Sequence, residues 1–274
     1  MFRAIHRVAR MLWNRSEQTG PGAIINAFFL RSATHMDEQV IAAMARWPNV
    51  PAVYGWLSLT GSGQWRLHPG GEALRHPESP GEAITSPQIL SFIERNYEAD
   101  TLGQWYFQNG PQRVYVRLDA APYLIHTTTD AATGRLLLRT HTGLDIRAVQ
   151  ALYLDDTGRL YAATDLGPGL IAGRDLPALL DAFQVINPPA ATADHSAQET
   201  SQQYAHVQEA LVQCLETGAT VVLLANGILG FPPHGLPLHP CQGSKLEATL
   251  GFRRLPQPPE GADDAQPPQE RPDR

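Results

Sequence analysis

The sequence predicts an α+β fold in which two strand–turn–strand–helix units are arranged around a central β-hairpin. Three observations support this prediction: alternation of side chains within residues 100–118, recurrence of a Gly-Gln-Trp motif, and five structural features that occur twice in the same order. A small helix–strand segment is expected at the C-terminal end.

The central hairpin is predicted from residues 100–118. Apolar Val114, Val116 and Leu118 alternate with polar or amphipathic residues, which is the period of a half-buried strand. Asn109-Gly110 is a turn dipeptide that tolerates positive φ. Trp105 is expected in the core, because large aromatic side chains most often serve as buried anchors.

The Gly-Gln-Trp motif of residues 103–105 also occurs at residues 63–65, and residues 158–160 carry a looser form. Residues 57–65 match residues 152–160 without a gap, as Leu-x-Leu-x-x-Ser/Thr-Gly followed by Gln or Arg and a bulky residue. Residues 84–97 then match residues 171–184, pairing Ile93 with Leu180. Strand, glycine turn, strand, loop and helix therefore occur twice, which predicts a repeated unit.

The remaining elements are predicted from periodicity and turn chemistry. A helix is expected over residues 37–47, a surface loop over 68–83, and a second helix after the Ser86-Pro87 start signal. Residues 122–128 and 135–141 form another hairpin candidate. Further along the chain, the sequence predicts a helix over 201–215, a buried strand over 220–225 and a turn-rich stretch over 227–240.

The domain organisation follows from these elements. Residues 36–185 are predicted to form the repeated α+β domain, residues 186–200 a linker, residues 201–255 a C-terminal helix–strand segment and residues 256–274 a disordered tail. Residues 1–35 are basic and are interpreted as an over-called or disordered extension, with Met36 favoured over Met1 as the start. A signal-peptide core at residues 23–30 is the less favoured interpretation, because it is short and contains Asn26.

Composition excludes some partners. A formal charge of −6 argues against nucleic acid, and no apolar run is long enough to predict a membrane span. The two cysteines, Cys214 and Cys241, lack disulfide or metal-site spacing, so a reducing, cytoplasmic compartment is expected.

The arrangement resembles uncharacterised proteobacterial families known only as domains of unknown function. The resemblance rests on the Gly-x-Trp strand pair with its following helix, and on the stretches 103–118, 120–123 and 139–143, and covers roughly residues 50 to 185. It implies repeated small α+β units and a suggested role in signalling or regulation. It implies no catalytic residue.

Three polar groupings are candidates for chemistry. His126 and His141 are expected to face each other across their hairpin; with no acid or nucleophile beside them, a structural role is favoured over catalysis. His234, His239 and Cys241 are metal-ligand types whose spacing fits no usual zinc pattern. The third grouping, Asp155-Asp156, is better suited to a turn than to calcium.

No nucleophile elbow, phosphate-binding loop, dinucleotide-binding fingerprint or metalloprotease motif is present in the sequence. We therefore expect a non-catalytic binding or regulatory module, without cofactor, whose partner is a protein or a small molecule. The alternative is a hydrolase-like enzyme or small-molecule sensor with a site built from dispersed residues such as His126, His141 and Asp145.

Overall fold

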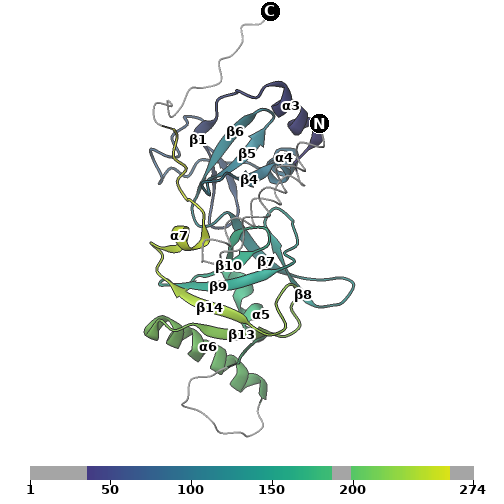
Figure 1. The fold of residues 1–274 in the computed structure, drawn as a ribbon, viewed down its shortest axis with the longest axis vertical. Helices are drawn as coiled ribbons and strands as arrows, with labels where there is room; N and C mark the ends of the chain where they lie inside the picture. The colour runs from purple at the N-terminus through teal and green to yellow at the C-terminus, as the bar shows by residue number, and fades with distance from the viewer. Residues whose placement is uncertain (1–35, 187–198, 260–274) are drawn as a thin grey trace, which may run out of the picture.

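The computed structural model describes residues 36–186 and 199–259, which form an α+β fold built on two sheets. The predicted fold class is confirmed. Figure 1 shows the first sheet in the upper half of the molecule and the second sheet in the lower half. Within the described ranges, no helix has the length and apolar character required to cross a membrane.

The first sheet has six strands in the order β3-β2-β1-β6-β5-β4. Strands β1 and β6 are parallel, and every other pair of neighbours is antiparallel. Two helices belong to this half of the chain. The elements are α3 (Glu38–Arg46), β1 (Val53–Leu59), β2 (Trp65–Leu67), β3 (Glu82–Ala83), α4 (Pro87–Arg95), β4 (Tyr97–Ala99), β5 (Trp105–Asn109) and β6 (Gln112–Leu118).

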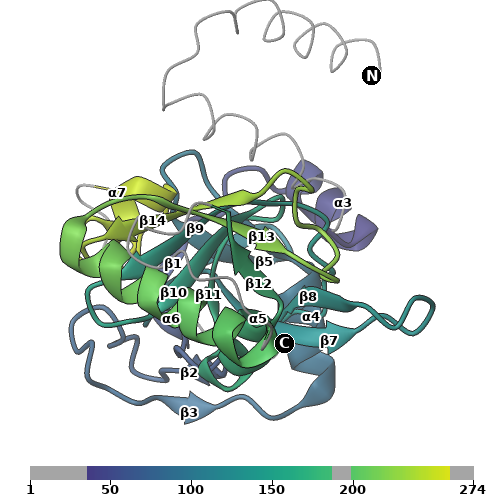
Figure 2. The same cartoon turned by 90° about the horizontal axis from the view of Figure 1, so that it is seen from below.

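The second sheet has eight strands in the order β12-β13-β14-β9-β10-β11-β7-β8. Figure 2 shows α6 lying across this sheet, where it contacts β12, β13, β14 and β9. The elements are β7 (Tyr123–Thr129), β8 (Leu136–Thr140), β9 (Val149–Asp155), β10 (Leu160–Thr164), β11 (Pro168–Ile171), η2 (Gly173–Asp175), α5 (Leu176–Asp181), β12 (Phe183–Val185), α6 (Glu199–Thr217), β13 (Val221–Ala225), β14 (Leu236–Cys241) and α7 (Leu246–Leu250).

Six strands of the second sheet repeat the order of the first sheet. The order β11-β10-β9-β14-β13-β12 corresponds to β3-β2-β1-β6-β5-β4, and in each case the two central strands are parallel. The register agrees with the predicted gap-free match, because Leu59 pairs with Trp65 as Leu154 pairs with Leu160. Both units therefore have the same topology, with α6 inserted only in the second.

The helices of the two units correspond with a shift of one residue from the predicted match. After α4, the amide of Asn96 donates to the carbonyl of Ile93, and the carbonyl of Asn96 accepts from the amide of Gln108. After α5, the amide of Ala182 donates to the carbonyl of Leu179, and the carbonyl of Ala182 accepts from the amide of Asn226. Ile93 therefore corresponds to Leu179, and the predicted pairing with Leu180 is wrong. Both Ile93 and Leu179 are the buried residues of their helices.

One type of five-residue turn occurs four times, and it accounts for the glycine of the recurring Gly-Gln-Trp motif. In each of these turns, a Thr or Asp side chain accepts a hydrogen bond from the amide four residues later, and a glycine occupies the fourth position with φ between 76° and 82°. Only glycine adopts this backbone conformation readily. The turns are residues 60–64, 100–104, 140–144 and 155–159.

One hydrophobic core joins the two sheets, because its buried residues form a single cluster that includes strands and helices from both units. Trp105 is 5% exposed, so its predicted core position is confirmed. It packs against Tyr123, with ring centroids 5.1 Å apart, and Tyr97 donates from its hydroxyl to the carbonyl of Pro122. These contacts connect β4 and β5 of the first sheet to the start of β7 in the second sheet.

The structure differs from the expectations for the turn of the central hairpin and for residues 227–255. The hairpin loop is Gly110-Pro111, since Asn109 pairs with Gln112. Strand β14 overlaps the stretch expected to be turn-rich, and β13 and β14 are inner strands of the second sheet.

The predicted tail begins inside the folded region, because Pro256 is buried and Gln257 donates its amide to Gln104. The expectations for residues 1–35, for the linker over 187–198 and for 260–274 lie outside the described residues.

Candidate functional site

Five ionisable residues gather where the start of the second sheet meets the helix that follows β11; they are called the junction cluster and are His126, Arg139, Asp145, Arg174 and Asp175. The register of the β7–β8 hairpin places His126 opposite Arg139, so both side chains emerge on one face. Strand β11 runs parallel to β7 and pairs Ile171 with Ile125, which brings residues 174 and 175 beside residue 126.

One ring nitrogen of His126 has two competing neighbours in the junction cluster. Its Nδ1 lies 3.1 Å from Oδ2 of Asp175 and 3.2 Å from Nη2 of Arg174. Nδ1 donates to the carboxylate in one tautomer and accepts from the guanidinium in the other, so the two hydrogen bonds exclude each other. On the neighbouring strand, Arg139 donates from Nε to Oδ1 of Asp145 over 2.6 Å.

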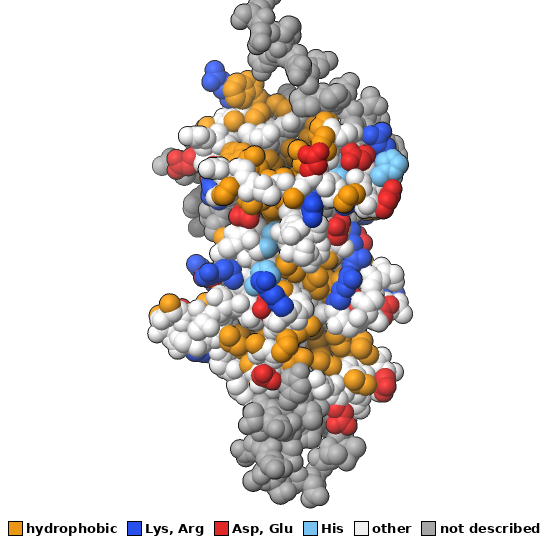
Figure 3. Space-filling model, turned by 180° about the vertical axis from the view of Figure 1, so that it is seen from behind, with side chains coloured by type: hydrophobic (Ala, Val, Ile, Leu, Met, Phe, Trp, Pro, Cys, Tyr) orange, Lys and Arg blue, Asp and Glu red, His pale blue; other side chains and the backbone are white. Residues whose placement is uncertain are grey.

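The junction cluster is accessible to solvent. Arg174 is 76% exposed and its Nε lies 3.8 Å from Asp175, whereas the side chain of His126 is 25% exposed. Figure 3 shows Lys, Arg and His side chains gathered across the middle of the back face, between the two halves of the molecule. Both arginines of the junction cluster are partly or largely exposed, and each lies beside an aspartate.

The structure brings two of the three sequence-predicted residues into this cluster. Arg139 links them, because it lies opposite His126 and is ion-paired with Asp145. His141 is elsewhere: its Nδ1 accepts a hydrogen bond from the amide of Leu124, and its ring lies among aromatic rings. The expectation that His126 and His141 face each other is wrong, because Arg139 is the residue opposite His126.

The Nε2 end of the His141 ring is enclosed although the residue as a whole is only half-buried, and desolvation is the main reason why the pKa of its imidazole falls to about 3. Its Nε2 has no hydrogen-bond partner and its ring is surrounded by Trp65, Tyr97 and Tyr123. A neutral, enclosed imidazole of this kind has a packing role.

The candidate metal ligands are not gathered into a site. His239 contacts the Thr220 hydroxyl at 2.9 Å and packs on Tyr153, while the thiol of Cys241 points toward Thr249. His234 is exposed in the loop before β14. Across residues 36–186 and 199–259, no three His, Cys, Asp or Glu side chains lie close enough together to hold a metal ion.

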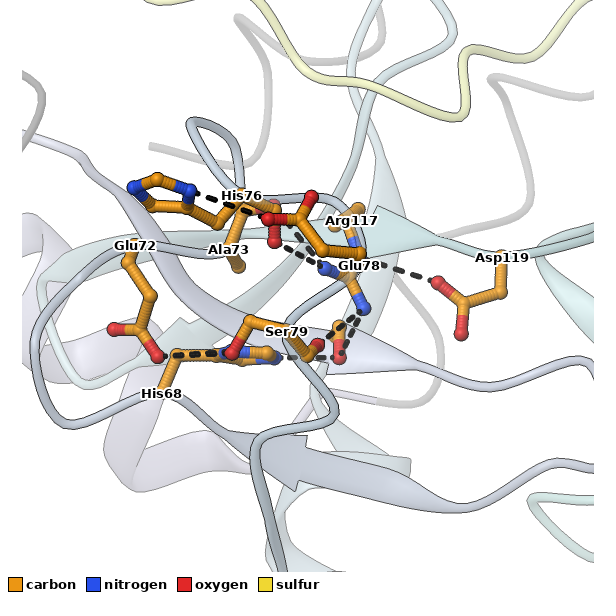
Figure 4. A network of polar contacts seen from close by, with 9 residues as sticks. His68, Glu72, Ala73, His76, Glu78, Ser79, Arg117 and Asp119 are labelled. Atoms are coloured by element: carbon orange, nitrogen blue, oxygen red, sulfur yellow. Dashed lines mark hydrogen bonds and ion pairs between the residues drawn. The ribbon is translucent and has the colours of Figure 1, made fainter.

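A second polar cluster, not anticipated from the sequence, lies under the loop of residues 68–81 and is shown in Figure 4. Its centre is Arg117 of β6, which is 4% exposed. The guanidinium donates to Asp119 and to three loop carbonyls, those of Ala73, His76 and Ser79, over 3.1–3.4 Å. These bonds fix the loop against the outer face of the first sheet.

The buried histidine of this cluster is His68, which is 0% exposed. Its Nε2 lies 2.8 Å from Oγ of Ser58, and its Nδ1 lies 3.4 Å from both Glu72 Oε1 and Ser79 Oγ. Burial, followed by the charge of Arg117, lowers the pKa of His68. The sequence signal for this site is weak, because His68 and Arg117 are far apart in the chain and no local motif links them.

Glycines allow the loop to approach the sheet. Gly55, in an irregular part of β1 with φ of +80°, would place a Cβ only 2.3 Å from the carbonyl oxygen of Gly71. A Cβ on Gly81 would lie 2.8 Å from the His68 ring. Glycine at these two positions therefore allows the loop to approach the sheet closely enough for His68 to contact Ser58.

The comparisons with known proteins identify a family without a known activity. The family model DUF2944, described as "Protein of unknown function (DUF2946)", matches residues 36–223, and no curated protein matches the chain. A solved structure of a DUF1285 family protein from Silicibacter pomeroyi DSS-3 is 16% identical, with a TM-score of 0.39 over 63% of this chain and 88% of that one. A second, from Shewanella baltica OS155, is 15% identical, with a TM-score of 0.31 over 44% of this chain and 86% of that one. Since the family model covers more than half of the sequence, the chain belongs to the family of proteins of unknown function described as DUF2946.

Proposed function

We propose that the protein is a binding module and that its junction cluster binds carboxylate groups of a partner. The observation that supports this most directly is the exposure of Arg174 beside His126 and Asp175, at a position where three elements converge. Guanidinium groups pair with carboxylates in a bidentate geometry, which gives specificity as well as affinity.

Stability alone does not explain this cluster. Exposed ion pairs contribute about 0–1 kcal/mol to the free energy of folding. In the Arg139–Asp145 pair, the side chain of Arg139 is 45% exposed and that of Asp145 is 52% exposed. The exposed guanidinium groups of Arg139 and Arg174 are better explained by recognition of acidic groups on a partner.

The alternative of a hydrolase built from His126, His141 and Asp145 has less support. His141 is enclosed by aromatic rings, and Asp145 is bound to Arg139 instead of orienting a histidine. A general base needs hydrogen-bond reach to a substrate proton, and the ring of His141 offers none.

Two further parts of the proposal concern origin and compartment. The shared strand order supports an internal repeat that arose by duplication, with the junction as a surface formed when the copies joined. The free thiols of Cys214 and Cys241 are in keeping with a reducing cytoplasm.

Affinity capture from the native host, read by mass spectrometry, tests the proposal with matched variants. Arg139→Glu combined with Arg174→Glu replaces both arginines of the junction cluster by acids, and Arg75→Glu is the same type of substitution on the exposed loop 68–81. We expect a near-stoichiometric partner with wild type and Arg75→Glu, and at least about tenfold weaker binding, or 1.4 kcal/mol, with the double variant. Equal capture by all three folded proteins would refute the assignment of this surface.

A further inference from the structure

The order of contacts from Ser58 through His68 to Glu72 is that of a Ser–His–carboxylate relay, which is recognised by geometry rather than by position in the sequence. Ser58 Oγ lies 2.8 Å from Nε2 of His68, and Nδ1 of the same ring lies 3.4 Å from Glu72 Oε1. The site is on the outer face of the first sheet and is separate from the junction cluster, so this inference goes beyond the proposed binding function.

Arg117 and Glu72, at the two ends of this chain of contacts, determine which atom donates in each hydrogen bond. Arg117 can only donate, and its Nη2 lies 3.4 Å from Ser58 Oγ, so the hydroxyl accepts from Arg117 and gives its own proton to His68 Nε2. Glu72, when ionised, only accepts, so Nδ1 of His68 carries the ring proton. Ser79 Oγ contacts the same Nδ1 and donates to Glu72, which reinforces this tautomer.

We propose that Ser58 is a nucleophile activated by His68 and Glu72, and that it accepts acyl groups from carboxylic esters when residues 74–80 of the loop move away from the sheet. The amides of His68 and Ala73 donate to the carbonyls of Trp56 and Gly55, so the start of the loop, with the base and its carboxylate, stays on β1. The neutral imidazole with its lone pair on the serine is the form required of a general base. Because His68 is 0% exposed and lies beside Arg117, its pKa is lowered and the ring is neutral near pH 7.

The reaction balances without a cofactor. Ser58 Oγ forms a bond to the carbonyl carbon while its proton moves to His68 Nε2, and the carbon–oxygen bond to the alcohol then breaks as that alcohol takes the proton. Water, deprotonated by the same nitrogen, hydrolyses the acyl-serine and releases the acid. The guanidinium of Arg117, whose Nη2 lies 3.4 Å from Ser58 Oγ, places a positive charge beside the carbon under attack, where the carbonyl oxygen becomes an oxyanion.

The loop has the features of a cover that opens. It is longer than about 12 residues and has no regular structure of its own, a combination that is often functional in compact domains. Glycines occupy both ends, at Gly70-Gly71 and Gly81. The bonds from Arg117 to its carbonyls hold it closed, and the longest of them measure 3.4 Å.

Labelling of the full-length protein with a fluorophosphonate probe tests this proposal, because such probes react with activated serines. Intact-mass measurement and peptide mapping should show one adduct, on Ser58, and none on the exposed Ser62. The variant Ser58→Ala should take up no probe. His68→Gln should slow labelling by about 10²–10⁴-fold, the usual contribution of a general base.

A second variant keeps the test decisive if His68→Gln does not fold. Glu72 is 28% exposed at its side chain, so Glu72→Gln preserves packing while removing the orienting charge, and its labelling should be slower than that of wild type. Absence of a Ser58 adduct in the folded protein, labelling only in denaturant, or equal rates for wild type and Glu72→Gln would each overturn the proposal. Partner capture through Arg139 and Arg174 is read out separately, so the two proposals can fail independently.

Discussion

His141 shows how enclosure changes a single ionisable side chain. Its ring is packed against Trp65, Tyr97 and Tyr123, at the place where the first unit meets the second. The folded protein holds this imidazole neutral, because desolvation and, to a lesser extent, the nearby His126 disfavour its charged form.

Stability should therefore fall as the pH falls. Burial lowers the pKa of His141 to about 3 from 6.5, so between these values the unfolded chain binds a proton that the folded chain excludes. The stabilisation is complete above pH 6.5 and is lost as the pH drops, by on the order of 4 kcal/mol at pH 3. Urea unfolding between pH 7 and pH 4 measures this slope.

The variant His141→Gln should have a shallower slope, and His76→Gln, whose side chain is 62% exposed in the wild type, should keep the slope of wild type. His68 shifts in the same direction as His141, so some dependence on pH remains in His141→Gln. Identical slopes for wild type and His141→Gln would mean that His141 is not buried in its neutral form.

Sequence reasoning at this scale identified ionisable residues but not their partners. His126 and Asp145 were candidates, yet Asp175 and Arg174 reach His126 from a segment that follows β11. That proximity depends on the parallel pairing of β11 with β7, which no local pattern encodes. The same limit applies to His68 and Arg117, which are brought together only when the loop folds over the sheet.

At the scale of elements, the close approach of the loop 68–81 to β1 depends on Gly55. We predict that Gly55→Ala destabilises the protein by more than its backbone conformation alone requires, because the added Cβ would meet the carbonyl of Gly71 at 2.3 Å. Gly143→Ala is the matched control, since its φ of +82° is nearly that of Gly55 and nothing lies within 4 Å of its Cβ position. Chemical denaturation should give a cost of about 1–2 kcal/mol for the control and about 1–3 kcal/mol more for Gly55→Ala.

Equal costs for the two variants would show that the loop does not rest on β1 in solution. A difference confined to Gly55→Ala would locate the strain at the contact between Gly55 and Gly71, where the loop begins to cover Ser58 and His68.

The segment after α7 links the two units. Arg253 donates its amide to the carbonyl of Gly103, and the carbonyl of Arg254 accepts from the amide of Leu118. Figure 1 shows this segment returning from the second sheet to the first. Phe252, at its start, is 2% exposed.

We predict that Phe252→Ala lowers the free energy of unfolding by about 3–5 kcal/mol, the usual cost of truncating a buried aromatic side chain. Leu255→Ala, at a position that is 48% exposed, should change it by no more than about 0.5 kcal/mol. Urea titrations of both variants measure the difference. A small effect of Phe252→Ala would mean that the segment is not docked.

The order of elements was largely predictable, because each hairpin and helix carries local signals such as alternation, Ser86-Pro87 and the glycine turns. Strand β14 was missed because Pro237 and Pro240 lie within it, and proline is depleted in inner strands. The insertion of α6 between β12 and β13 also separated the last two strands of the second unit from the first four. The predicted sequence match between the two units therefore ended at residue 184 and did not include β13 and β14.

At the scale of the whole molecule, the two units have the same strand order but do not have separate cores. The larger of the two clusters of buried residues includes side chains from both sheets, and the aromatic contacts of Trp105 and Tyr97 with Tyr123 of β7 cross between the sheets. The junction cluster lies on this shared body, so its geometry depends on both halves remaining folded together.

Native-state amide hydrogen exchange as a function of denaturant tests this central claim most directly. The parallel pairs β1–β6 and β9–β14 are inner pairs of their sheets, and a single cooperative body requires both to open with the same free energy, equal to that of global unfolding. We predict that amides of Leu59 and Leu154 merge into one exchange isotherm. If the amides of β1 and β6 exchange through a separate opening of lower free energy while β9 and β14 stay protected, the two units fold independently and the account of a shared body is contradicted.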